Sequence, residues 1–203
     1  MADITQMNIS DVTYTINAPK AQTVNTTIDS STTTKLPVVF SAATTAGYNA
    51  YKMNTSVTVQ PSTGVLFGAA WNDYAEYRQL EGLAAKPGEV VCETGHDTVE
   101  RSVGKLGPAP AVVSNTYGFI IGEEENSVPV AVAGKVLVYV EGSREKYKVG
   151  DVFCAGADGK ACLMTKEEIK MYPDRILGYY VGTPDYEYFN DIPVDGRIWI
   201  RIK

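Results

Sequence analysis

The sequence predicts an all-β protein, in which a thin threonine-rich β segment precedes a duplicated β domain with one short helix. Three observations predict this class. Short β-branched runs bounded by Gly, Pro and Asn follow residue 86, and such runs are typical of half-buried strands. A strand-rich unit recurs within the second half of the chain. In the front third, threonine alternates with apolar residues, which also suits strands.

The N-terminal segment 1–65 differs in composition from the rest of the chain. It contains about 14 of the 19 threonines, only about six charged side chains and few large core residues. Segments 12–16 (VTYTI) and 57–59 (VTV) alternate as strands do. A flexible linker is the alternative interpretation, because Ser/Thr-rich composition is also typical of tethers. The apolar groups of 35–40 (KLPVVF) favour thin β-structure that needs neighbours.

The C-terminal domain is predicted over residues 66–203, with two pseudo-repeats at about 86–140 and 148–203. The segment KPGEVVC, which starts at residue 86, recurs as KVGDVFC from residue 148. At the same offset of 62 residues, GKVLV from residue 134 recurs as GRIWI from residue 196. GFIIG from residue 118 also corresponds to GYYVG from residue 178, at an offset of 60. Repeated units usually build a scaffold or a binding surface.

One helix is predicted directly after Thr165. The sequence Thr-Lys-Glu-Glu is a capping-box pattern, in which the Thr side chain and Glu168 each accept a hydrogen bond from the other's backbone amide. Pro173 is expected to end the helix, because proline cannot continue one.

Charge and hydropathy exclude several classes of partner. The net charge is −6 and the pI is near 4.9, with no run of Lys or Arg, so nucleic acid and anionic membranes are poor partners. The start of the chain has neither a basic n-region nor an apolar h-region, and no stretch is apolar enough to cross a membrane. We therefore expect synthesis in a reducing cytoplasm without a signal peptide, which the three widely spaced cysteines also fit.

Few residues suggest an enzyme or a metal site. His96 is the only histidine, so any histidine-dependent nucleophile must use it, yet it lies in an expected hairpin turn. A zinc site of Cys92, His96, Cys154 and Cys162 lacks the paired C-x₂₋₄-C spacing, and Cys92 and Cys154 fit equivalent core positions of the two repeats. The acidic segment 122–126 is typical of a solvated turn. We predict no cofactor and no metal.

Asp73 and Glu76 are the one group of side chains in the sequence that could catalyse a reaction. Two carboxylates at this spacing could act as acid and base on the peptide bond that precedes Asp73. The same spacing could equally cap a short helix or alternate with Arg78 along a strand. The residues alone leave both interpretations open.

The motif WNDYAEY at 71–77, with KPGEVV at 86–91 and DGRIWI at 195–200, resembles the C-terminal domains of tailed-phage fibre and appendage proteins. Some of these domains are classed as peptidase G2 or intramolecular chaperone domains. The resemblance covers roughly residues 64–203, and the DYAEY core is its most specific part. It implies that three chains associate in register through this domain.

The resemblance also implies self-cleavage in some members, just before the Asp of the motif. In this chain the bond would be Asn72–Asp73, with Asp73 and Glu76 as the acting carboxylates. Relatives that cut often have a small Ser before the Asp, whereas here Asn72 follows the bulky Trp71. A cut there would also leave little more than a Thr-rich stub. We therefore predict a structural protein rather than an enzyme, with self-cleavage as the alternative.

The predicted function is that of a structural virion protein, a short homotrimeric phage fibre on the head or the tail, made in the cytoplasm of a bacterial host. Its expected partners are two further copies of itself and a capsid or tail protein. The N-terminal residues are expected to hold the virion, because they are apolar with few charges and would need cover. The predicted anchor residues are Ile4, Met7, Ile9, Val12, Tyr14 and Ile16.

A host surface glycan is an alternative partner. Five aromatic side chains near the C-terminus have flat faces that could stack on sugars. They are Tyr179, Tyr180, Tyr186, Tyr188 and Phe189. Aromatic packing at the axis or rim of a trimer is the competing interpretation.

Overall fold

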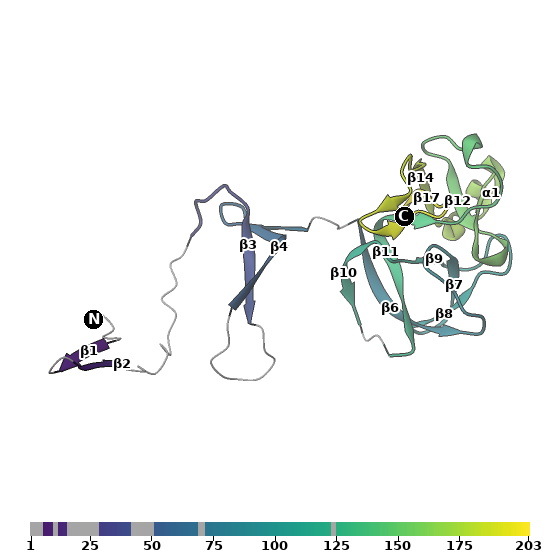
Figure 1. Cartoon of the computed structure of the whole chain (residues 1–203). Coiled ribbons are helices and arrows are strands. Elements are labelled where there is room, and N and C mark those ends of the chain that lie inside the picture. The colour runs from purple at the N-terminus through teal and green to yellow at the C-terminus, as the bar shows by residue number, and fades with distance from the viewer. Residues whose placement is uncertain (1–5, 10–11, 16–28, 42–50, 69–71, 123–124) are drawn as a thin grey trace. The chain divides into compact units, whose positions relative to one another are not determined.

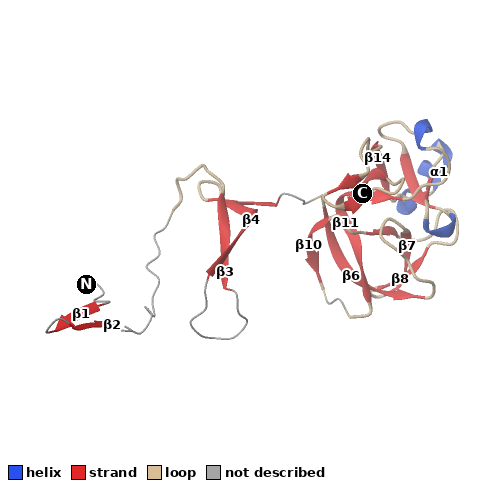
Figure 2. Cartoon of the chain, viewed as in Figure 1, coloured by secondary structure: helices blue, strands red, loops and turns tan. Residues whose placement is uncertain are grey.

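The computed structural model describes residues 6–9, 12–15, 29–41, 51–68, 72–122 and 125–203. These residues form β-strands joined by turns, with one short α-helix and three short 3₁₀ helices (Figures 1 and 2). The all-β class predicted from the sequence is therefore confirmed. The chain divides into two compact units, Met1–Ala69 and Ala70–Lys203.

The N-terminal unit contains two small antiparallel sheets. One is the hairpin of β1 (Gln6–Ile9) and β2 (Val12–Thr15). The other has three strands in the order of the sequence, namely β3 (Leu36–Ser41), β4 (Tyr51–Gln60) and β5 (Val65–Gly68). Threonine and valine favour such strands because their branched side chains fit a pleated surface.

Ten strands of the C-terminal unit form one continuous sheet in the order β10-β6-β8-β7-β9-β11-β17-β14-β12-β13, and β6 also pairs with β11. A separate hairpin, β15–β16, lies between β14 and β17 in the chain. The elements are β6 (Asp73–Glu81), β7 (Val90–Gly95), β8 (Thr98–Arg101), β9 (Pro110–Val113), β10 (Tyr117–Ile121), β11 (Ser127–Val138), η1 (Arg144–Lys146), β12 (Val152–Ala155), η2 (Ala157–Gly159), β13 (Ala161–Leu163), α1 (Lys166–Met171), η3 (Pro173–Arg175), β14 (Gly178–Gly182), β15 (Tyr188–Phe189), β16 (Ile192–Pro193) and β17 (Ile198–Ile202).

Five strands of this sheet close on themselves as a first barrel. β6 pairs with β8, β8 with β7, β7 with β9, β9 with β11, and β11 again with β6 (Figure 1). Closure removes free sheet edges and creates an interior that side chains fill. Each of the five strands contributes at least one apolar residue to a common cluster, among them Leu80, Val91, Val99, Val113 and Val130.

A second barrel follows the same plan. Its strands are the C-terminal half of β11, then β17, β14, β12 and β13. It closes where Ala161 bridges to Val140 in parallel, with the Ala161 amide donating to the Tyr139 carbonyl over 2.8 Å. Its interior again takes at least one residue from each strand or its extension, among them Val140, Phe153, Ala161, Tyr180 and Ile200. The long strand β11 is therefore a strand of both barrels, its N-terminal part in the first and its C-terminal part in the second.

Each barrel contains one hairpin in the register that the sequence match predicts. Cys92 lies opposite Glu100 in β7–β8, and Cys154 lies opposite Cys162 in β12–β13, so both members of the pair keep the offset of the sequence match. The turns before the hairpins also match, because in each a lysine amide donates to the acid three positions ahead. These bonds are Lys86 to Glu89 at 3.0 Å and Lys148 to Asp151 at 2.8 Å.

Outside these hairpins, the segments that match in sequence do not occupy equivalent positions in the two barrels. Segments 134–138 and 196–200 are not counterparts, since β11 and β17 pair with each other and Leu137 lies opposite Trp199. Segments 118–122 and 178–182 also differ, because β10 runs parallel to β6 on the outside of the first barrel whereas β14 is a strand of the second. The barrel strand equivalent to β14 is β9, which pairs with β7 as β14 pairs with β12.

The predicted helix is confirmed as α1. The Thr165 hydroxyl accepts from the Glu168 amide over 3.1 Å, and the Glu168 carboxylate accepts from the Thr165 amide over 2.7 Å. This reciprocal cap satisfies amides that a helix start otherwise leaves unpaired. Pro173 follows in η3 and ends the helix as expected.

Candidate functional site

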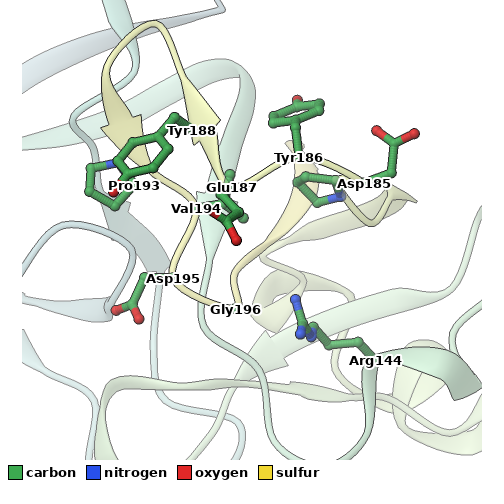
Figure 3. A pocket seen from close by; sticks show the side chains of 10 residues that line it. Arg144, Asp185, Tyr186, Glu187, Tyr188, Pro193, Val194, Asp195 and Gly196 are labelled. Atoms are coloured by element: carbon green, nitrogen blue, oxygen red, sulfur yellow. The ribbon is translucent and has the colours of Figure 1, made fainter.

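A hollow in the surface of the C-terminal unit lies beside the β15–β16 hairpin (Figure 3). This aromatic–acidic pocket is open to solvent and has a volume of about 790 Å³. Its walls come from residues 184–188, which lead into β15, from residues 193–196, which leave β16, and from Arg144 of η1. The lining residues are Arg144, Pro184, Asp185, Tyr186, Glu187, Tyr188, Pro193, Val194, Asp195 and Gly196.

Two tyrosines give the pocket its aromatic character. Tyr188 is 62 % exposed and Tyr186 is 42 % exposed. The indole Nε1 of Trp199 donates to the Tyr186 hydroxyl over 2.9 Å, and Phe189 packs edge-on against Trp199 with ring centroids 5.2 Å apart. Tyr186 is thus held by the barrel below it, while Tyr188 offers a free ring face to solvent.

The charged groups of the pocket are predominantly acidic. Asp185, Glu187 and Asp195 supply carboxylates, and Arg144 supplies one guanidinium (Figure 3). Asp195 also accepts a hydrogen bond from the Tyr139 hydroxyl, which fixes its orientation. Burial together with this carboxylate raises the pKa of Tyr139 to about 12. The pocket therefore favours neutral or cationic ligands over anions.

Arg197 holds the loop that carries Asp195. Its side chain is buried, and its guanidinium donates to the carbonyls of Val194, over 3.1 Å, and of Pro193. A third bond, also 3.1 Å, runs to the Asn115 side chain in the first barrel. Burial lowers the pKa of Arg197, which nevertheless stays charged at neutral pH. The loop is consequently fixed by a charged group that is shielded from solvent.

Only part of the aromatic set predicted for glycan binding lies in this pocket. Tyr186 and Tyr188 line it, and Phe189 packs behind them. Tyr180 is buried in the second barrel and shares a hydrogen bond with Thr183, so its face is not available. Tyr179 lies on β14 and does not line the pocket.

The pocket's acids and Arg144 were not predicted from the sequence. The alternation of acid and aromatic in PDYEY, at 184–188, is a signal that could have found part of the set. Arg144 has no such signal, because it reaches the pocket from η1, in an earlier part of the chain.

Asp73 is buried at the start of β6. It is 6 % exposed, and its Oδ1 accepts from the Thr116 hydroxyl over 2.7 Å. Its Oδ2 has no hydrogen-bond partner among the described residues. Burial raises the pKa of Asp73 above its ordinary value, against the opposing hydrogen bonds of Thr116 and Ser114. An under-satisfied buried carboxylate of this kind costs stability when charged.

Glu76 does not meet Asp73. Residues at this spacing along a strand point to opposite faces of the sheet. On its own face Glu76 accepts from Arg78 over 2.7 Å, and Arg78 also contacts Asp97 over 2.5 Å. The two carboxylates thus form separate environments rather than one acid–base pair.

The peptide bond before Asp73 is part of the sheet. The Asn72 carbonyl accepts from the Lys135 amide over 3.0 Å. The backbone of Gly134 packs directly on it, since a Cβ at Gly134 would lie 2.3 Å from the same oxygen. The Asn72 carbonyl oxygen is thus engaged by β11.

The remaining predicted residues are placed as follows. His96 lies in the β7–β8 turn with its side chain in solvent, 2.7 Å from Asp97. Cys92, Cys154 and Cys162 are buried free thiols. Residues 123–124 of the acidic segment lie outside the described residues. Within the described ranges no three His, Cys, Asp or Glu side chains are arranged to hold a metal ion.

Four of the six predicted anchor residues fall in the first hairpin. Met7 is paired with Tyr14, and Ile9 is paired with Val12. The other two, at positions 4 and 16, lie outside the described residues.

No helix in the described part of the chain combines the length and apolar character needed to span a bilayer. No family model, curated protein or solved structure matches the chain.

Proposed function

We propose that the protein is a structural virion component, a short homotrimeric phage fibre that is anchored through its N-terminal unit and presents its C-terminal double barrel outward. The observation that carries this proposal is the lack of a core in the N-terminal sheet. None of the residues 29–39 and 52–68, for which burial is described, is buried. A three-stranded sheet without a covered face is marginal in water.

The same sheet carries an apolar row across its three strands. Leu36, Val59 and Leu66 lie side by side in register, and paired residues point to the same face. Leu36 and Leu66 are both exposed. Two further copies of the chain would cover this row, because threefold association packs the same face of each copy around one axis.

The C-terminal unit supports a display role. It has its own buried core in both barrels and carries most of the charge of the chain. A self-sufficient, charged domain can stand in solvent, whereas the N-terminal sheet cannot. This asymmetry supports an anchored front and an exposed head.

Light scattering on the full chain tests the oligomer. We expect a mass three times the 22.0 kDa of one chain. Leu66→Asp should give monomers with an intact C-terminal near-ultraviolet circular dichroism signal, because it places a charge in the apolar row. Ser56→Asp, a polar position on the same sheet, is the matched control and should remain trimeric. A monomeric wild type at micromolar concentration would overturn the proposal.

Glycan binding at the aromatic–acidic pocket is the second candidate function. The exposed face of Tyr188 beside three carboxylates favours it, since sugar C–H groups stack on aromatic rings and sugar hydroxyls donate to carboxylates. The acidic lining selects neutral or amino sugars. On a glycan array Tyr188→Ala should lose binding, and Tyr179→Ala should retain it because Tyr179 lies outside the pocket. An array without signal for the wild type would eliminate this function.

Self-cleavage before Asp73 has less support. Glu76 lies on the other face of β6, and the Asn72 carbonyl is hydrogen-bonded within the sheet. Intact-mass spectrometry decides the matter, since cleavage predicts a fragment starting at Asp73 that is absent in Asp73→Ala. We expect only the uncut chain.

A further inference from the structure

Two cysteines face each other across the second hairpin. Cys154 of β12 and Cys162 of β13 are paired residues, and their sulfur atoms are 3.4 Å apart. Both residues are buried. They belong to an apolar cluster with Met164, Leu106 and Ile169. The equivalent pair of the first barrel is Cys92 and Glu100, so two thiols meet only in the second.

The backbone register places this pair at a hydrogen-bonded site of the ladder. The Met164 amide donates to the Val152 carbonyl over 2.9 Å, and the Gly156 amide donates to the Lys160 carbonyl over 2.8 Å. Because hydrogen-bonded pairs alternate with open ones in an antiparallel ladder, Cys154–Cys162 is also a hydrogen-bonded pair, with Cα atoms roughly 5.5 Å apart. That Cα separation is common for disulfides, but the Cβ atoms of such a pair are also about 5.5 Å apart, which is wider than the roughly 3.5–4.5 Å of most disulfides. The bond therefore needs side-chain rotation and a small local approach of β12 and β13, and the resulting disulfide is strained and more easily reduced than an unstrained one.

The two thiols influence each other's ionisation. Their mutual hydrogen bond lowers the pKa of Cys154, whereas the interaction with Cys154 and burial raise the pKa of Cys162. The charge of Lys105, which is held 2.6 Å from Glu168 of α1, lowers the pKa of both. The contact between the sulfur atoms thus favours a single thiolate in the pair, which can act as the nucleophile.

We propose that Cys154 and Cys162 are an oxidative modification site that forms a cross-strand disulfide once the protein meets a small-molecule disulfide. The Cys154 thiolate attacks one sulfur of oxidised glutathione, forming a mixed disulfide and releasing one glutathione thiolate. Cys162 then loses its proton to that thiolate or to water and attacks Cys154 Sγ, releasing the second glutathione. One protein disulfide forms, and one glutathione disulfide is reduced to two thiols.

The fold offers a route for the oxidant. Ile169 of α1 packs against the cluster that holds both thiols, and none of the six residues of α1 is buried. A short, exposed helix opens at lower free energy than a core strand. The reaction does not depend on the proposed fibre role. If that role holds, release by host lysis would bring the protein from a reducing cytoplasm into oxidising surroundings.

The full chain, purified under reductant and then equilibrated with oxidised glutathione, tests the site. The number of free thiols titrated in denaturant should fall from three to one, and the intact mass should decrease by the mass of two hydrogen atoms. Trypsin cuts at Lys160, between the two cysteines, so peptides 149–160 and 161–166 should be linked until reductant is added. We expect the oxidised chain to melt about 5 °C higher than the reduced chain.

Cys92→Ser is the matched control. Cys92 is also buried, and burial raises its pKa to about 11, yet it lies opposite Glu100 rather than opposite a second thiol. This variant should still form the disulfide, whereas Cys154→Ala and Cys162→Ala should not. Three free thiols after equilibration, or a linkage that includes Cys92, would overturn the proposal. The wild-type peptide map decides the outcome even if an alanine variant fails to fold.

Discussion

Three buried charges, Asp73, Glu89 and Arg197, lie at the points where chain segments distant in sequence meet. Glu89 is paired with Arg101, Arg197 is satisfied by carbonyls, and Asp73 has one oxygen without a partner among the described residues. A buried charge costs desolvation energy that only specific hydrogen bonds offset. These residues therefore respond differently to substitution and to pH.

Glu89→Gln should destabilise the chain by about 1.5–3 kcal/mol, because Arg101 donates to both carboxylate oxygens over 3.0 Å. Burial alone would raise the pKa of Glu89, but the Arg101 and Lys86 hydrogen bonds outweigh it and hold the pKa below the ordinary 4.5. The stabilisation is therefore present above about pH 4.5 and is lost as the pH falls through the lowered pKa. Urea unfolding at pH 7 and pH 3 measures it. An equal deficit at both pH values would contradict this assignment.

Asp73→Asn should show the opposite dependence. The folded-state pKa of Asp73 is raised by burial, so wild-type stability falls as the pH rises from about 3.8 through that raised pKa. Asparagine keeps an oxygen for the Thr116 hydroxyl and carries no charge. The melting temperature of the variant relative to wild type should thus be higher at pH 7 than at pH 4. The same difference at both values would show that Asp73 is not a source of pH dependence.

At the scale of elements, the duplicated turns provide an internal comparison. Gly88 and Gly150 precede the equivalent hairpins and have φ angles of 92° and 94°, a region that favours glycine. A Cβ at Gly88 would lie 2.3 Å from Cδ of Arg197. A Cβ at Gly150 would have no atom of the described residues within 4 Å, apart from its neighbours in the chain. The same backbone conformation thus occurs in a crowded and in an open setting.

Gly150→Ala should cost about 1–2 kcal/mol, through backbone strain alone. Gly88→Ala should cost a further 1–3 kcal/mol or so, because it also displaces the Arg197 side chain that holds the pocket loop. Chemical denaturation of both variants gives the difference. Equal costs would mean that Arg197 moves aside freely and does not fix the loop.

At the scale of the whole molecule, the two units differ in what each needs from a partner. The double barrel has its own core, whereas the described N-terminal sheet has none. Removing residues 1–28 retains the apolar row of β3–β5 and the Asp29 side chain that accepts from the Thr32 amide over 3.0 Å. If the chain is a trimer as proposed, the truncated chain should therefore remain a folded trimer.

If residues 1–28 hold the virion, this truncated trimer should not cosediment with particles that lack the fibre, whereas the full chain should. Light scattering on the same sample shows whether the trimer persists. Cosedimentation of the truncated protein would place the anchor elsewhere in the chain.

The sequence by itself determined the β class, the two equivalent hairpins and the capped helix α1. These features follow from local rules, namely side-chain alternation, turn residues and cap chemistry, which act between near neighbours in the chain. It also drew attention to Tyr186 and Tyr188, though not to the acids beside them.

Only the tertiary structure decided how the strands close. The rules that act between chain neighbours do not predict that β11 is shared by two barrels. They also do not predict that Arg144 lies beside the loop of Asp195, or that Cys154 pairs with Cys162 while Cys92 has no thiol partner. Each depends on pairing between segments that are distant in the chain, where burial of the whole interior selects one register. The match of 134–138 with 196–200 shows the limit of sequence comparison for strand placement. These two similar segments pair with each other instead of occupying equivalent positions in the two barrels.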